Sequence, residues 1–142
     1  MFFKFLNILK DNNLYLNYKQ NRYKTIINKL KTKDKISVIF LINHISQWKY
    51  QTLFNLFNKS KKYVPFVIFI PDDNHSNSYL DGYIFNKSEF KKNNIQLISS
   101  FVDSNNSWQN LDKIYKPDIV FFSRSLLKSK NKYSILNFKN SL

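Results

Sequence analysis

The sequence contains no cysteine and one glycine, Gly82, and each scarcity excludes a class of site. Without cysteine, the chain can form no disulfide, no thiolate metal site and no cysteine nucleophile. Dinucleotide-binding folds and P-loop proteins hold phosphate with several glycines, because the backbone must approach the phosphate closely. A single glycine cannot build either loop. We therefore expect no cofactor held by a glycine fingerprint, and no other cofactor is indicated.

Histidine is also scarce, since the chain has only His44 and His75, so a site with several histidine ligands is not expected. In residues 71–77, Asp72 and Asp73 lie beside His75, a mixture that could bind a metal. Adjacent carboxylates point apart in an extended loop, however, and Pro, Asp, Asn and Ser readily form turns. We interpret this segment as a solvated turn and predict no metal site.

Long apolar runs are absent as well. No run approaches the roughly 20 residues that span a bilayer. The opening MFFKFLNIL is interrupted by Lys4 and is followed by no small-residue cleavage site. The sequence therefore predicts neither an export signal nor a transmembrane anchor.

Positive charge is the most prominent feature that is present. The 142 residues carry a net charge of +14, and residues 1–35 contain nine Lys or Arg against Asp11 and Asp34. Such charge is typical of proteins that bind nucleic acid or an anionic membrane surface. An AT-rich coding sequence would produce the same abundance of Lys, Asn, Ile, Phe and Tyr. The charge alone does not identify a partner, and we expect no specific nucleic acid.

Residues 1–33 are predicted to form a basic amphipathic helical segment. Its apolar positions recur at helical spacing, with lysines mostly to the side of the stripe, and they are Tyr23, Ile26, Ile27 and Leu30. Two alternatives remain for this stripe. It packs against the rest of the chain, or the helix lies on an anionic membrane surface with Phe2, Phe3 and Phe5 inserted.

Residues 34–142 are predicted to form one α/β domain, a Rossmann-like three-layer domain with a mostly parallel four-stranded sheet. Apolar runs begin near Ile36, Phe66, Ile95 and Ile119, at intervals of 30, 29 and 24 residues. These intervals leave room for a crossover helix, whereas hairpins would recur about every 8–12 residues. The intervening helices are expected at residues 50–58, at 88–93 or further back toward residue 79, and around Trp108, Leu111 and Ile114.

A polar elbow follows the first predicted strand. Parallel strands are buried on both faces, and open α/β sheets bind ligands at the carboxyl ends of their strands. We therefore predict a substrate-binding set in this elbow, which consists of His44, Ser46, Gln47 and Trp48. Ser46 could instead be the N-cap of the next helix, and Trp48 could pack the elbow. His44 has no neighbouring acid in the sequence, so we assign no catalytic residue.

Three stretches in this order resemble a known family. They are KISVIFLINHISQWKYQTLFNLF, YVPFVIFIP and YKPDIVFF. Together they resemble the N-terminal half of CDP-glycerol glycerophosphotransferase-like proteins, which act in teichoic acid and capsular polysaccharide assembly. The matching positions are Trp48 to Tyr50 and Lys116 to Phe121, and the resemblance covers residues 20–125.

The resemblance implies a GT-B-like transferase in which two Rossmann-like domains face each other. Such enzymes transfer glycerol phosphate from a CDP-activated donor to a growing polymer at the inner membrane face. This chain corresponds to the first, acceptor-side domain. The family's Trp-His-Gly tripeptide is missing, and no second domain follows. The resemblance therefore implies a domain or fragment that is inactive alone, is cytoplasmic or peripheral at the inner face of the plasma membrane, and needs a separate C-terminal transferase domain.

Two other interpretations remain open. The chain could be a non-catalytic binding module for nucleic acid or another polyanion, with lysines interleaved among Tyr and Phe. Aromatic platforms for bases lie in the alternating strands of antiparallel sheets, whereas these strands are apolar on both faces. The chain could also be a remnant that folds without an activity of its own.

Overall fold

The computed structural model describes residues 17, 20–70, 79–102 and 107–123. The predicted turn at residues 71–77, the aromatic residues Phe2, Phe3 and Phe5, and the C-terminal residues 124–142 lie outside this part. The chain divides into two compact units, residues 1–34 and 35–142.

The N-terminal unit contains the predicted helix, which is described over residues 20–31. Its apolar stripe is largely accessible, with Tyr23 54% and Ile27 46% exposed. Whether the stripe packs against protein or lies on a membrane stays a prediction. Among the described residues, no helix combines the length and apolar character needed to cross a membrane.

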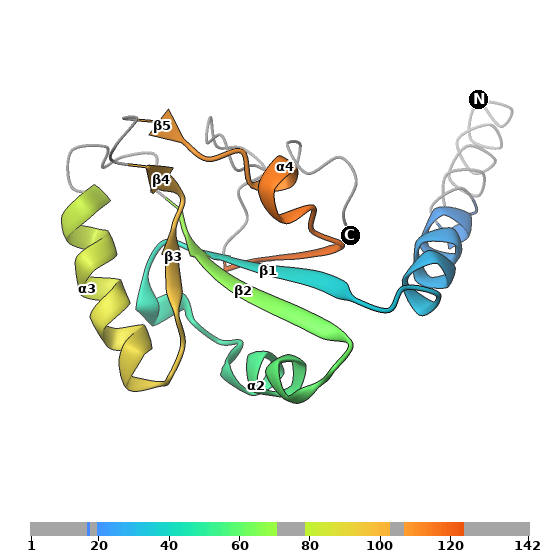
Figure 1. Cartoon of the computed structure of the whole chain (residues 1–142), viewed down its shortest axis with the longest axis horizontal. Helices are drawn as coiled ribbons and strands as arrows, with labels where there is room; N and C mark the ends of the chain where they lie inside the picture. The colour runs from blue at the N-terminus through green and yellow to red at the C-terminus, as the bar shows by residue number, and fades with distance from the viewer. Residues whose placement is uncertain (1–16, 18–19, 71–78, 103–106, 124–142) are drawn as a thin grey trace, which may run out of the picture. The chain divides into compact units, whose positions relative to one another are not determined.

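The second unit is built on a four-stranded parallel sheet. Its strands are β1 (Ile36–Ile42), β2 (Tyr63–Phe69), β3 (Leu97–Ser99) and β6 (Ile119–Phe122), in the order β3-β2-β1-β6. All three pairings are parallel. Figure 1 shows β1 and β2 crossing the centre of this unit. The predicted Rossmann-like domain is therefore confirmed.

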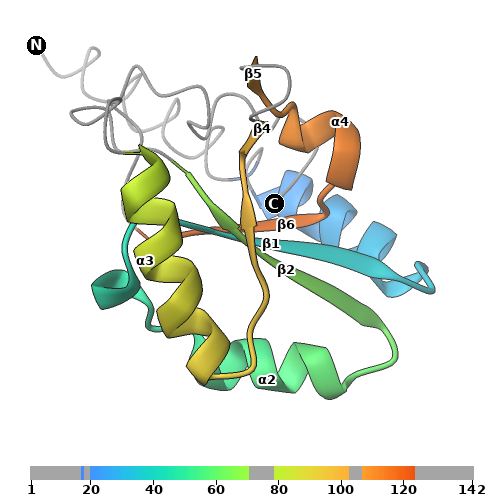
Figure 2. The same ribbon diagram turned by 60° about the vertical axis from the view of Figure 1, so that its left-hand side comes forward.

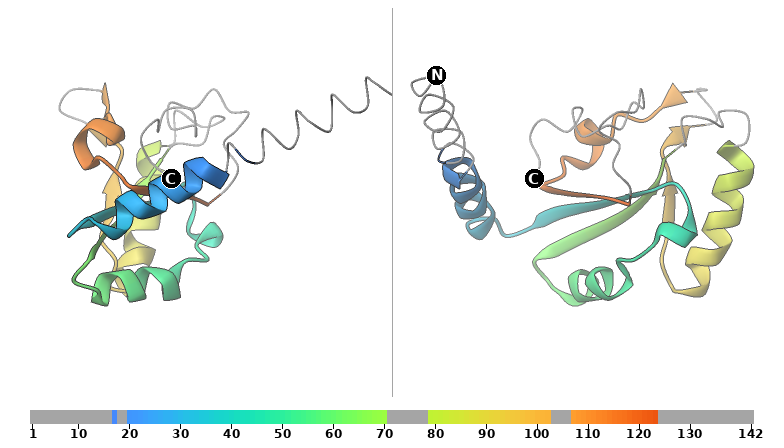
Figure 3. Two further views of the ribbon diagram at one scale, coloured as in Figure 1. Left: turned by 90° about the vertical axis from the view of Figure 1, so that its right-hand side faces the viewer. Right: turned by 180° about the vertical axis from the view of Figure 1, so that it is seen from behind.

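Three helices cover the two faces of the sheet. The helices are α2 (Gln51–Lys59), α3 (Tyr79–Lys92) and α4 (Leu111–Tyr115). The connections from β1 to β2 and from β2 to β3 run the same way across the sheet, so right-handed crossovers put α2 and α3 on one face. The connection from β3 to β6 runs the other way, so it puts α4 on the opposite face. Figures 1 and 3 show α2 and α4 on opposite sides of the sheet.

A second, two-stranded antiparallel sheet was not predicted. It pairs β4 (Phe101–Val102) with β5 (Ser107–Trp108). Trp108 belongs to this sheet, so its expected place in a helix with Leu111 and Ile114 was wrong. The ring of Trp108 lies 4.8 Å from that of Phe101 and packs against the α4 face of the core. Trp108 and Leu111 are three residues apart because both pack into the same core, although they lie in different elements.

The two faces of the sheet have different cores. On the α2 and α3 face, Phe40 is 1% exposed and stacks on Phe121 at 4.9 Å between ring centres. The opposite face is mainly aliphatic, and its buried cluster consists of Ile39, Leu41, Ile68, Ile70 and Leu111. Alternate residues of β1 therefore supply both cores, as expected for a strand covered on both faces.

Strand β2 begins at Tyr63, three residues before the predicted start, and includes Pro65. Proline is rare inside sheets because it cannot donate to a ladder. The Lys62 carbonyl accepts a hydrogen bond from Ile36 in β1. Backbone polar groups of successive residues in a strand point to alternate neighbouring strands, so the nitrogen of Pro65, three residues later, faces β3. The first β2–β3 pair is Val67 with Leu97. Pro65 therefore costs no hydrogen bond to β3.

The Lys116-Pro117-Asp118 segment connects α4 to β6. Lys116 adopts the left-handed conformation, with φ 43°, at the C-cap of α4. The Asp118 carboxylate accepts a hydrogen bond from the Ser37 N–H at 3.1 Å, and the Asp118 N–H donates to the Ser37 carbonyl at 2.9 Å. Burial raises the pKa of the nearby Tyr115 hydroxyl above 10.0. This segment joins β6 to the start of β1, which is a structural role.

Gly82 lies in the interior of α3, where no backbone strain requires glycine. A Cβ atom built there would lie 3.5 Å from Cζ of Phe69, an ordinary van der Waals distance. Gly82→Ala should therefore stabilise the chain by about 0.5–1 kcal/mol through helix propensity. Urea denaturation of the two full-length proteins measures this gain. A lower midpoint for the variant would show that Phe69 cannot accommodate a methyl group.

Candidate functional site at the carboxyl edge of the sheet

The sheet has a topological switch point between β1 and β6. The chain runs from β1 through β2 to β3 and then returns to the other side of β1 for β6, so the strand order reverses between these two strands. In α/β proteins, ligands bind beside the carboxyl ends of the strands where the order reverses. The elbow at residues 43–50 follows β1, and Ser123 follows β6. The predicted polar elbow is therefore at this edge.

Two anchors fix the elbow. The side chain of Asn86, 1% exposed, accepts a hydrogen bond from the Ile45 N–H at 2.5 Å and donates to the Gly82 carbonyl at 2.6 Å. At the other end, the Tyr50 hydroxyl donates to the Phe122 carbonyl at 3.0 Å. The elbow is thus tied to α3 and to the end of β6. A binding site held by two elements needs little ordering when a ligand arrives.

His44 and Ser46 form a local pair on the exposed side of the elbow. His44 is the N-cap of the short 3₁₀ helix η1 (Ile45–Gln47), because its Nδ1 accepts the Ser46 N–H at 3.1 Å. This bond places the proton of a neutral imidazole on Nε2. The ring also stacks on Phe85, 6.0 Å away. The alternative of Ser46 as N-cap was wrong, because His44 caps η1 and Tyr50 is the N-cap residue of α2.

Gln47 lies nearest to the switch point. Its Oε1 accepts a hydrogen bond from the Ser123 hydroxyl at 3.2 Å, which joins the elbow to the residue after β6. Its Nε2 group is bonded to no described residue. The buried Oδ1 of Asn43 also lacks a hydrogen-bond partner in the described part of the chain. The edge therefore offers the Gln47 amide donor to a ligand, whereas the Asn43 oxygen is enclosed by the protein.

Trp48 turns away from this polar set into the aromatic core. Its ring meets Phe40, Phe54 and Phe90 edge-on at 5.6, 6.1 and 5.1 Å. Its indole N–H donates to Oε1 of Gln51 at 2.9 Å. These contacts agree with the packing alternative, so we place Trp48 outside the candidate set, which keeps His44, Ser46 and Gln47.

The set is nearly free of charge. Lys49 is the one charged residue of the elbow, and it is exposed. Across the described ranges, no group of three or more His, Cys, Asp and Glu side chains could hold a metal ion. The elbow can donate and accept hydrogen bonds, which suits binding and positioning a ligand.

Three residues of this region were not predicted from the sequence as site residues. Asn86 lies in the middle of a helix, Tyr50 contributes through its hydroxyl, and Ser123 follows the fourth strand. Only Ser123 carried a usable signal, because it directly follows an apolar strand and so lies at the same edge as the elbow. The role of Asn86 depends on which helix packs beside the elbow, and that of Tyr50 depends on which strand lies beside β1.

Comparison with known proteins gave no match to a family model, a curated protein or a solved structure. A parallel sheet with a polar elbow at its switch point can bind a ligand through hydrogen bonds.

Proposed function

We propose that the chain is the acceptor-side, N-terminal domain or fragment of a CDP-glycerol glycerophosphotransferase-like enzyme. Enzymes of this GT-B-like class act in cell-envelope or capsular polymer synthesis. The observation that carries the proposal is the contact between Gln47 and Ser123, which closes an uncharged polar set over the switch point. The family resemblance of residues 20–125 supplies the reaction class.

The chemistry of the edge favours an acceptor hydroxyl. The oxygen of a hydroxyl group accepts hydrogen bonds, so it can pair with Nε2 of Gln47. Nε2 of His44 provides one more donor on the exposed side of the elbow. The elbow contains no carboxylate, which would repel the phosphates of an anionic acceptor polymer. The acceptor is therefore held by hydrogen bonds and not by an ion pair.

The proposal requires a partner that carries the donor. The elbow has neither a glycine-rich loop nor a cluster of cations for the phosphates of a CDP-activated donor. A separate C-terminal transferase domain would bind that donor across the cleft, and the present chain is inactive without it. Residues 1–35, with a net charge of +7, would hold the protein at the inner face of the membrane. Each basic residue near an anionic surface contributes about 1 kcal/mol.

The proposal is tested by CMP release. The chain is mixed with CDP-glycerol and a lipid-linked glycerol phosphate acceptor, with and without the C-terminal half of a CDP-glycerol glycerophosphotransferase. We expect release only in the complete mixture. Gln47→Met should then reduce kcat/KM for the acceptor by about tenfold, because one buried hydrogen bond to the acceptor is lost.

Gln20→Met is the matched control, since Gln20 is exposed on the N-terminal helix and should leave the rate unchanged. Amide NMR shifts on addition of the acceptor should fall on Asn43 and Gln47. A complete mixture that releases no CMP, with an acceptor that shifts neither residue, would exclude the transferase role. Equal losses for the two variants would exclude the elbow as the acceptor site.

A further inference from the structure

A groove lies between α3 and β3, the outermost strand on the side of the sheet away from β6. Its volume is about 710 Å³, within the usual range for small-ligand sites. Figure 2 shows α3 alongside β3 at this edge. Eleven residues line this α3–β3 groove, and they are Tyr83, Lys87, Lys91, residues 94–99, Phe101 and Gln109.

One wall of the groove is a single stripe of α3. Tyr83, Lys87 and Lys91 are spaced four residues apart, so their side chains lie one above another. The Tyr83 hydroxyl donates to the Leu97 carbonyl at 3.2 Å, which ties this wall to β3. Nζ of Lys87 lies 5.4 Å from the centre of the Tyr83 ring. The wall is therefore ordered and presents two ammonium groups.

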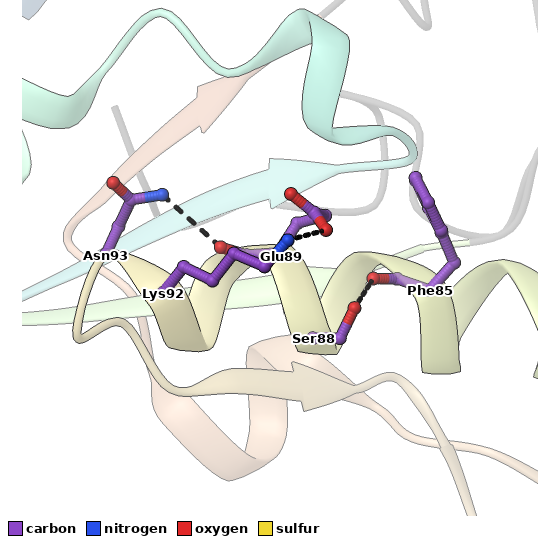
Figure 4. Close-up of polar contacts among 5 residues, drawn as sticks. All are labelled: Phe85, Ser88, Glu89, Lys92 and Asn93. Carbon is purple, nitrogen blue, oxygen red and sulfur yellow. Dashed lines mark hydrogen bonds and ion pairs between the residues drawn. The ribbon is translucent and has the colours of Figure 1, made fainter.

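No carboxylate lines the groove to neutralise these lysines. Glu89 lies two residues from both Lys87 and Lys91, so it projects from the other side of the helix. There it pairs with Lys92 at 2.6 Å, as Figure 4 shows. Among the residues that the structure describes, none forms a salt bridge with Lys87 or Lys91. Both charges are available to a ligand.

The other side of the groove adds neutral polar groups. Asn94, Gln96 and Gln109 contribute side-chain amides, and their N–H groups bind anions without adding charge. An added peptide strand is a poorer fit, because the Leu97 carbonyl on the outer edge of β3 already accepts the Tyr83 hydroxyl. The groove therefore favours a ligand that is recognised by side chains.

We propose that the α3–β3 groove binds a linear ligand that carries two neighbouring phosphate groups, one at Lys87 and one at Lys91. The two lysines are one helical turn apart, about 6 Å along the axis. Charge-assisted hydrogen bonds from both ammonium groups hold the phosphates, and the amide side chains contact the remaining oxygens. No residue of the elbow lines this groove, so the site does not depend on the proposed function.

Calorimetry of the full-length chain with sodium tripolyphosphate tests the proposal, because the end phosphates of this probe can reach both lysines. The double variant K87Q/K91Q should lower the affinity by about tenfold or more. The control K59Q/K61Q removes the same charge from exposed positions outside the groove and should change the affinity less than about twofold. NMR shifts should include the side-chain amides of Gln96 and Gln109.

Equal losses in the two double variants would show general attraction to a basic surface and would overturn the proposal. Absence of tripolyphosphate binding would also overturn it. A short glycerol phosphate oligomer distinguishes the source of the phosphates. Tighter, Lys87-dependent and Lys91-dependent binding of the oligomer would identify a phosphodiester polymer, whereas preference for tripolyphosphate would identify a small polyphosphorylated ligand. None of these measurements involves CDP-glycerol or transfer, so their failure is separate from that of the proposed function.

Discussion

Replacing Phe40 with alanine is expected to lower the free energy of unfolding by about 3–5 kcal/mol. Phe40 is 1% exposed at the centre of the larger core. Its ring centre lies 4.9–6.3 Å from those of Trp48, Tyr50, Phe54, Phe57 and Phe121. The truncation removes burial from all five neighbours and leaves a cavity that close-packed rings cannot fill. The total free energy of unfolding of a small domain is about 5–15 kcal/mol, so the variant should be close to unfolding.

Urea denaturation followed by tryptophan fluorescence measures this loss. A Trp108→Phe background leaves Trp48 as the reporter, and Trp48 lies 5.6 Å from Phe40. Phe85→Ala is the matched control, because Phe85 is 51% exposed and should cost much less. Phe40→Leu should fall between the two. A loss below about 1 kcal/mol for Phe40→Ala would contradict the core described here.

The sheet could be predicted because its signal is a period along the chain. Apolar runs at intervals of 24–30 residues fit only strands that are joined by crossovers. The same logic placed α2 within one residue of its observed ends, since Phe54 and Phe57 share one helical face. It also placed the polar elbow at the carboxyl edge, because a buried strand must end where polar residues resume.

Details that depend on three-dimensional neighbours could not be predicted. Trp108, three residues before Leu111, has helical spacing but lies in β5, because both side chains reach the same core from different elements. Ser46 has the chemistry of an N-cap, yet a 3₁₀ turn intervenes before α2 and His44 caps that turn. One-dimensional patterns report which residues are buried, and they do not report which partner buries them.

Asn86 is the clearest case of such a residue. It is a polar side chain in the middle of α3 and is 1% exposed. From sequence, an asparagine in a helix suggests a solvated face, because its amide competes with the helical backbone. In the fold it satisfies a backbone N–H of the elbow and a carbonyl of its own helix. Asn86 is therefore the link between α3 and the candidate site.

Asn86→Ala is accordingly expected to lower the free energy of unfolding by about 2–4 kcal/mol, because the buried Ile45 N–H loses its acceptor and a cavity forms. Asn86→Leu restores volume without the hydrogen bond and should still cost about 1–3 kcal/mol. Asn93→Ala is the matched control, since Asn93 is exposed and its side-chain amide donates to the Glu89 carbonyl near the end of α3 (Figure 4). It should cost less than about 0.5 kcal/mol.

Amide hydrogen exchange at Ile45 separates a local effect from a global one. In both Asn86 variants the Ile45 N–H should exchange faster than the loss of global stability alone explains, because the elbow detaches from α3 before the sheet opens. Binding of an acceptor at Gln47 should weaken in parallel, since η1 carries both Ile45 and Gln47. If Asn86→Leu were as stable as the wild type, with unchanged exchange at Ile45, the elbow would be held by the Tyr50 contact to Phe122 and by packing alone.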